Sequence, residues 1–133
     1  VGNDQALEPW LDEALCTYSE KLFFENVYPD ALTWWWTWRV NYYEPSGPIN
    51  ISIYDPPNAV NEWRLYRDPV YLRGAQFMEA LRQEIGDEAF FNVLRKYAAK
   101  YAYDLADGEG FWEIVESQTE TDLAALKSEY FSP

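Results

Sequence analysis

The clearest helical pattern in the chain is Pro69-Val70-Tyr71-Leu72-Arg73-Gly74-Ala75-Gln76-Phe77-Met78-Glu79-Ala80-Leu81-Arg82-Gln83-Glu84-Ile85-Gly86. Its apolar residues recur every three or four positions, which is the spacing of one face of an α-helix. Pro69 suits a first helical turn, and Gly86 suits a left-handed cap at the end. Asp87 follows at once as the expected N-cap of a helix over 88–101, so we expect a tight corner between two helices here.

Two helices and a loop are predicted upstream of this pair. Apolar residues spaced by three or four predict a helix over 9–28. Asp30 can cap a second helix over 30–44, which is rich in aromatic residues. The composition then shifts to Pro, Gly, Ser and Asn over about 45–57, around isoleucines at alternate positions. We expect a Pro-rich loop there, with room for one short strand.

Two shorter helices are predicted downstream. Asp107 can cap a helix over 109–117, and Thr119 with Asp122 three positions on resembles a capping box before Leu123. The chain therefore has about six predicted helices and little or no sheet. This pattern indicates the all-α class.

Length and charge limit what the chain can be. Its 133 residues suffice for one domain, 1–133, with its own core, and no linker long enough to divide it is evident. Ten Lys and Arg against 23 Asp and Glu give a net charge of −13, which repels phosphate backbones, so nucleic acid is excluded as a partner. No apolar run is long enough for a membrane span.

The chain contains no histidine, which removes the commonest zinc ligand and the commonest general base near neutral pH. Cys16 is the only cysteine, and its position on an otherwise apolar helical face predicts a small core residue. The candidate chemical groups are therefore carboxylates and phenols. No phosphate loop, nucleophile elbow or cysteine pair for a metal is present.

An aromatic cluster stands out in the second predicted helix. Trp34, Trp35, Trp36 and Trp38 lie almost all round that helix. Such a cluster could stack on a sugar or a peptide. We favour instead a role in the core and in an interface with a neighbouring part of a larger protein, because aromatic residues on helices most often serve packing.

The stretch Glu8-Pro9-Trp10-Leu11-Asp12-Glu13-Ala14-Leu15-Cys16-Thr17-Tyr18-Ser19-Glu20 carries a family resemblance. It resembles the helix that supplies the third zinc ligand in the gluzincin aminopeptidases, of the alanyl aminopeptidase and leukotriene hydrolase type. The resemblance implies that Glu13 is the zinc ligand. Asp12 replaces the Asn that is usual in the family, and Ala14 replaces the usual Gly.

A second stretch, Tyr66-Arg67-Asp68-Pro69-Val70-Tyr71-Leu72-Arg73-Gly74-Ala75, is similar to the Tyr-x-Lys-Gly region of the same family. The resemblance implies that the Tyr71 hydroxyl donates a hydrogen bond to the oxyanion during peptide hydrolysis. Tyr66 stands where the family often has another tyrosine, and Arg73 replaces the usual Lys. The fold implied is the helical C-terminal part of a thermolysin-like catalytic domain.

The family motif H-E-x-x-H, which holds two zinc-binding histidines and the general base, is absent from these residues. Family spacing places the second histidine about seven positions upstream of Val1. We therefore expect a fragment of a zinc aminopeptidase that is inactive alone and binds no zinc, although its parent would bind zinc and a peptide substrate. Its other partner would be the upstream part of the same domain.

A second hypothesis stays open: an acidic, aromatic-rich helical module that binds a basic or glycan partner and has no catalytic activity. The gene upstream of Val1 distinguishes the two hypotheses, because only the first requires H-E-x-x-H there. The location of the parent protein is left open, with an extracytoplasmic or cell-surface one slightly favoured.

Overall fold

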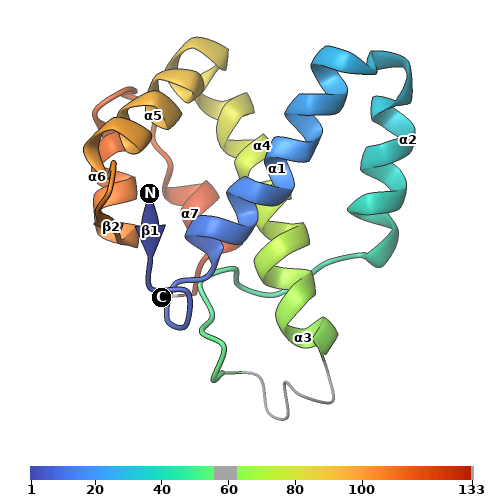
Figure 1. Cartoon of the computed structure of the whole chain (residues 1–133), viewed down its shortest axis with the longest axis horizontal. Helices are drawn as coiled ribbons and strands as arrows, with labels where there is room; N and C mark the ends of the chain where they lie inside the picture. The colour runs from blue at the N-terminus through green and yellow to red at the C-terminus, as the bar shows by residue number, and fades with distance from the viewer. Residues whose placement is uncertain (56–62, 133) are drawn as a thin grey trace.

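The computed structural model describes residues 1–55 and 63–132 (Figure 1). Its helices are α1 (Trp10–Val27), α2 (Pro29–Arg39), η1 (Asn41–Tyr43), α3 (Trp63–Arg67), η2 (Asp68–Arg73), α4 (Gly74–Ile85), α5 (Asp87–Lys100), α6 (Gly108–Glu116) and α7 (Ala124–Tyr130). Because α3, the π-helix η2 and α4 follow one another without a break, the described residues form six long or medium helical segments besides the short 3₁₀-helix η1. This confirms the predicted all-α class.

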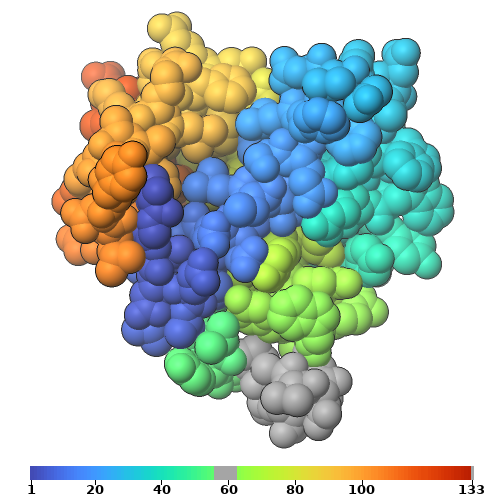
Figure 2. Space-filling view, viewed as in Figure 1, coloured from blue at the N-terminus to red at the C-terminus, as the bar shows by residue number. Residues whose placement is uncertain are grey.

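The two strands are very short. β1 (Gly2–Asn3) and β2 (Leu105–Ala106) pair in parallel, with Gly2 opposite Leu105 and Asn3 opposite Ala106. Figure 2 shows the first residues of the chain lying against the segment that carries β2. This strand pairing holds the residues that precede α1 against the segment that follows the C-terminal end of α5.

Helix α1 lies across α4 at the centre of the molecule, with α2 on one side and α5 and α6 on the other (Figure 1). The core is aromatic around Trp10, the first residue of α1. Its ring meets those of Phe77, Phe111 and Phe131 edge to face, with centroids 6.0, 5.4 and 5.0 Å apart. These contacts join α1, α4, α6 and the C-terminal segment, and so fix where α1 begins.

A network of charged groups joins the other end of α1 to α4 and α5. Arg82 binds both carboxylate oxygens of Glu25 at 2.9 Å, and it also pairs with Asp87 at 2.8 Å. Lys21, which is only 8% exposed, bridges Glu25 at 3.2 Å and Glu79 at 2.9 Å. The core and this network together hold α1 and α4 in register along their length.

The second predicted helix is shorter than expected. It ends at Arg39 and is followed by the 3₁₀-helix η1, after which Glu44 has a positive φ of 48°. The short strand considered for the Pro-rich loop does not form in residues 45–55; residues 56 and 57 lie outside the described residues. The N–H of Ile49 bonds to Tyr130 and that of Ile53 to Ala6, so the loop is attached to two separate segments and has no partner strand.

Several predicted caps differ from the structure. Gly86 does have a positive φ of 81°, but its ψ of 161° lies outside the left-handed helical region. Asp87 is the first residue of α5, and its carboxylate pairs with Arg82 rather than capping the helix. Asp30 also lies inside the first turn of its helix and makes no cap. These carboxylates thus complement the helix dipole from within the first turn.

At the C-terminal helices one cap is confirmed and one is wrong. Asp107 accepts a hydrogen bond from the Gly110 N–H at 2.8 Å, as predicted. The capping box does not form, because Thr119 accepts from the Thr121 N–H and Asp122 from the Ala124 N–H. Within residues 1–55 and 63–132, no helix combines the length and apolar character that crossing a membrane requires.

Candidate functional site

The hydroxyl of Tyr71 donates a hydrogen bond to Oε1 of Glu13 at 2.6 Å. The two residues are 58 positions apart and come from η2 and α1, which pack against each other. Both side chains are half-buried. The structure therefore brings together the two residues to which the family resemblance assigns roles.

The surroundings of Tyr71 keep its hydroxyl protonated. Burial raises the pKa of the phenol well above its ordinary value, and the hydrogen bond to Glu13 and the charge of that carboxylate raise the pKa further. At neutral pH Tyr71 is consequently a neutral hydrogen-bond donor. A phenol must be protonated in this way to donate a hydrogen bond to an oxyanion.

Tyr66 and Trp63 pack around Tyr71. The rings of Tyr66 and Tyr71 are 6.0 Å apart at 74°, and Trp63 lies 5.2 Å from Tyr66 and 5.9 Å from Tyr71. Tyr66 is buried, and burial, followed by the charges of Glu13 and Asp12, raises the pKa of its phenol. Trp63 was not singled out in the sequence, although its spacing of three from Tyr66 is the helical signal that joins them.

The π-helix η2 determines how Tyr71 is presented. Pro69 has no N–H to donate to the carbonyl one turn earlier, which interrupts the α-helical bonding pattern. The Gly74 N–H donates instead to the carbonyls of Pro69 and Tyr71, which closes a wide turn. The buried Asp68 pairs with Arg64 at 3.1 Å and with Arg67, so ion pairs hold the turn from its first residue.

Asp12 makes its hydrogen bonds away from the Glu13 and Tyr71 pair. One of its oxygens accepts from Gln5 Nε2 at 2.9 Å and the other from the Cys16 thiol at 3.3 Å. Cys16 is exposed, so the prediction of a core cysteine is wrong: the residue lies one helical turn after Asp12 on the outer face of α1. The partial burial of the sulfur against α1 and its bond to Asp12 nevertheless raise the pKa of this thiol to about 11.

Glu13 suits the role of one zinc ligand, because carboxylate oxygen is among the donors that zinc accepts. Zinc sites in proteins take at least three protein ligands. Among the described residues, no three His, Cys, Asp or Glu side chains come close enough to hold a metal ion. The described residues therefore do not form a complete metal site by themselves.

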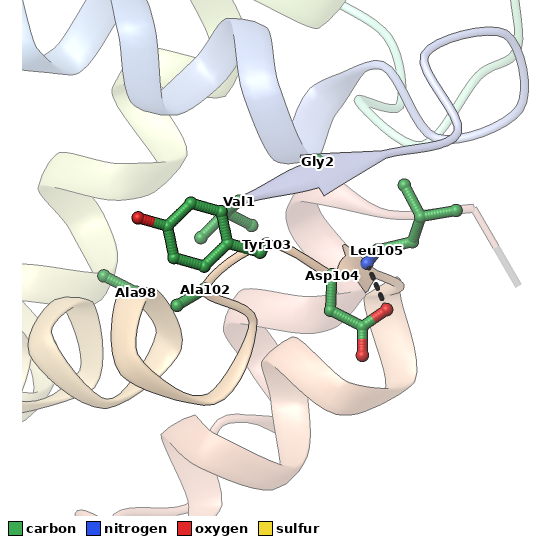
Figure 3. Close-up of a pocket in the computed structure, with 7 residues that line it drawn as sticks. All are labelled: Val1, Gly2, Ala98, Ala102, Tyr103, Asp104 and Leu105. Atoms are coloured by element: carbon green, nitrogen blue, oxygen red, sulfur yellow. Dashed lines mark hydrogen bonds between the residues drawn. The ribbon is translucent and has the colours of Figure 1, made fainter.

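A surface hollow lies away from the Glu13 and Tyr71 pair. It has a volume of about 570 Å³ and is formed where the first two residues of the chain meet the turn after α5 (Figure 3). Figure 3 shows Val1, Tyr103 and Leu105 around it. The only charged side chain that lines the hollow is Asp104, and it accepts from the adjacent Leu105 N–H at 2.8 Å. The hollow thus offers no set of groups for catalysis.

The structure also locates the tryptophan cluster. Trp35 is buried and stacks on Phe24 with ring centroids 5.3 Å apart and an interplanar angle of 20°. Trp34 and Trp38 are 63% and 53% exposed. Part of the cluster therefore serves the core, and part lies on the surface.

The sequence is similar to known proteins over most of its length. Residues 1–130 match the model of the peptidase family M1 domain. Aminopeptidase M1-B of Oryza sativa subsp. japonica is 27% identical over an alignment of 122 residues that covers 83% of this chain and 13% of that protein. Leucyl aminopeptidase of Saccharolobus solfataricus is 21% identical over 132 residues, covering 92% and 16%. Aminopeptidase N of Lactobacillus helveticus is 23% identical over 129 residues, covering 88% and 15%.

The chain spans only about a seventh of the length of these curated relatives. No solved structure gives a significant match. The family model nevertheless covers almost every residue, including both stretches that carry Glu13 and Tyr71. The chain belongs to the peptidase M1 family.

Proposed function

We propose that this chain is the helical part of a zinc aminopeptidase catalytic domain, in which Glu13 is one zinc ligand and Tyr71 stabilises the oxyanion of peptide hydrolysis. The observation that supports this most directly is the 2.6 Å hydrogen bond between the two side chains. It joins a carboxylate and a neutral phenol from two distant segments at one place. The relatives described above are named as aminopeptidases, which supports a peptide as the substrate.

Tyr71 would act by donating its hydroxyl proton in a hydrogen bond to the carbonyl oxygen of the scissile peptide. Such a donor is worth most when negative charge develops on that oxygen, so it stabilises the transition state more than the bound substrate. Its raised pKa keeps it protonated for this purpose. The packed rings of Tyr66 and Trp63 limit the directions that its own ring can take.

Glu13 would hold the metal from α1, a helix that the aromatic core and the ion pairs fix at both ends. A zinc ion supplies Lewis-acid chemistry for hydrolysis. Two further protein ligands are required, and family spacing assigns them to the histidines of H-E-x-x-H, outside these 133 residues. The proposed site is consequently shared between this chain and a segment that precedes it in the sequence of a longer protein.

The gene provides the first test. We expect H-E-x-x-H to be encoded within about forty codons upstream of Val1, with its second histidine about seven positions before that residue. Presence of the motif at this distance would support the shared site. An upstream reading frame without it would overturn the assignment of Glu13 as a ligand.

A binding module remains the second candidate, and one observation favours it. Three aromatic residues spaced four positions apart are all more than half exposed: Trp34, Trp38 and Tyr42. An acidic protein with such an aromatic face suits a basic peptide. Titration of the chain with a lysine-rich and arginine-rich peptide, followed by tryptophan fluorescence, separates the candidates: saturable binding that Trp34→Ala abolishes would favour the module.

A further inference from the structure

A close approach between two small residues lies directly beside the Glu13 and Tyr71 pair. Gly74 follows η2 immediately, and Ala14 follows Glu13 in α1. A Cβ built on Gly74 would lie 2.6 Å from the Cβ of Ala14 and 3.2 Å from its Cα. Both residues are buried. The backbones of α1 and α4 therefore meet here at a distance that only glycine at position 74 permits.

The distance between these backbones bears directly on the hydrogen bond. Carbon atoms of packed side chains are ordinarily about 3.5 to 4.0 Å apart, so a methyl group at position 74 would require α1 and α4 to separate by about 1 Å. Adding that displacement to the 2.6 Å bond between Tyr71 and Glu13 gives about 3.6 Å, which is no longer a hydrogen bond. We therefore expect a single methyl group at position 74 to separate the two side chains.

The close approach sets how near Tyr71 lies to α1, and the π turn sets the direction in which the Tyr71 side chain points. Residues five positions apart point about 140° away from each other in an α-helix. Tyr66 and Tyr71 nevertheless lie with ring centroids 6.0 Å apart, because the turn between them is widened by one residue. The same turn is closed by the Gly74 N–H, so one residue sets both the rotation of Tyr71 and its distance from α1.

We propose that Gly74 is a positioning residue that places the Tyr71 hydroxyl on Glu13, an inference that rests on the proposed function for its catalytic meaning. Gly74 touches neither carboxylate nor phenol. It acts by letting the turn that carries Tyr71 pack directly on Ala14.

The experiment moves one methyl group from one side of the contact between Ala14 and Gly74 to the other. The variants are Gly74→Ala, Ala14→Gly, and the double variant Ala14→Gly with Gly74→Ala, which moves the methyl group from α1 to α4. In each background the coupling between Tyr71→Phe and Glu13→Gln is measured by a double-mutant cycle on urea unfolding. All variants are measured with the same concentration of trimethylamine N-oxide, which favours the folded state and keeps weak variants measurable.

In the chain without a substitution at position 14 or 74, we expect a coupling of about tenfold in the unfolding equilibrium constant, since the bond joins a hydroxyl to a charged group. It should fall below about twofold in Gly74→Ala and return in the double variant, while Ala14→Gly alone keeps it. Overall stability is a poor guide here, because alanine favours a helix more than glycine does while the contact opposes it. The coupling between Tyr71→Phe and Glu13→Gln reports whether the two side chains are in contact, whatever the overall stability of the variant.

The ¹³Cζ shift of Tyr71 in an NMR spectrum gives an independent reading. Glu13→Gln should move this resonance in the chain with the natural residues at positions 14 and 74, and also in the double variant Ala14→Gly with Gly74→Ala. It should leave the resonance unmoved in Gly74→Ala. A coupling or a shift response that survives in Gly74→Ala overturns the proposal, as does its absence in the parent chain. Neither measurement uses zinc or peptide, so their failure is distinct from failure of the proposed hydrolysis, which the gene and activity tests address.

Discussion

The Tyr71 hydroxyl reaches the Glu13 carboxylate although 58 positions separate the two residues. The bond crosses from η2 to α1, the helix that is fixed at its first turn by Trp10 and along its second half by Lys21. Neither helix could make this contact alone. The pair is a product of tertiary packing, and its chemistry can be tested by changing one atom.

Tyr71→Phe removes only the hydroxyl oxygen. In a chain extended to include H-E-x-x-H, we expect this change to lower kcat by about 10² to 10³-fold and to leave KM nearly unchanged, because the donor is lost mainly from the transition state. Steady-state hydrolysis of an aminoacyl p-nitroanilide measures both constants. Tyr42→Phe is the matched control, since that ring is 63% exposed. A rise in KM at constant kcat would show that Tyr71 binds substrate instead.

The isolated chain should bind no stoichiometric zinc at neutral pH. One carboxylate cannot compete with water for the ion, and the described residues form no group of three possible ligands. Calorimetric titration with zinc chloride, with Glu13→Gln as the comparison, measures this. Heat from a single tight site that Glu13→Gln abolishes would show that the chain completes a metal site by itself.

The sequence identified the pair but not its geometry. Glu13 and Tyr71 were found because each lies in a short stretch with family character. The π turn was missed, because Pro69 reads equally well as the first residue of a helix, and the helical residues that precede it, 63–67, have no clear periodicity. Trp63 was missed because its spacing of three from Tyr66 is too short a pattern to predict a helix by itself. The orientation of Asp12 towards Cys16 depends on local competition for hydrogen bonds, which the sequence alone does not reveal.

The end of α4 and both bounds of α5 were predicted to within one residue, because each of these helices has one apolar face; the predicted start at Pro69 was wrong, since α4 begins at Gly74. Predictions that depended on one side chain at a helix end were less successful. Asp87 was expected to cap α5, but Arg82 lies close enough to take its carboxylate in an ion pair. Such competition depends on residues from a neighbouring turn and cannot be seen in the residues of the cap alone.

The tryptophans of α2 predict an uneven response to truncation. Trp35→Ala should lower the free energy of unfolding by about 3 kcal/mol, because the buried ring stacks on Phe24 and leaves a cavity. Trp34→Ala should change it by less than about 0.5 kcal/mol, since that side chain is 63% exposed. Urea unfolding followed by circular dichroism compares them. Equal losses would mean that Trp34 is covered in solution, for example by a second copy.

Glu25 predicts a loss of stability in acid. Its bonds to Arg82 lower the pKa of the carboxyl below the ordinary value of 4.5, although burial opposes this. The ion pair therefore stabilises the fold above that value, and its contribution is lost as the pH falls through the lowered pKa. Glu25→Gln should cost about 1 kcal/mol at pH 7 and almost nothing at pH 2. Glu84→Gln, at an exposed position of α4, is the control for urea unfolding at both pH values.

Tyr97 predicts a loss of stability in alkali. Burial raises the pKa of its phenol above the ordinary value of 10.0, so the unfolded chain gives up this proton at a lower pH than the folded chain does. The contribution is complete below about pH 10 and is lost as the pH rises further, because ionisation then favours the unfolded state.

The urea midpoint of the parent chain should consequently fall more steeply between about pH 9 and pH 11.5 than that of Tyr97→Phe, which has no proton to lose at this position. Tyr103→Phe serves as the matched control, because the Tyr103 ring is fully exposed and its removal should leave the slope as it is. If Tyr97→Phe and Tyr103→Phe gave the same slope as the parent chain, the Tyr97 hydroxyl would have to be open to water, in disagreement with its position between α5 and α6 against Phe111.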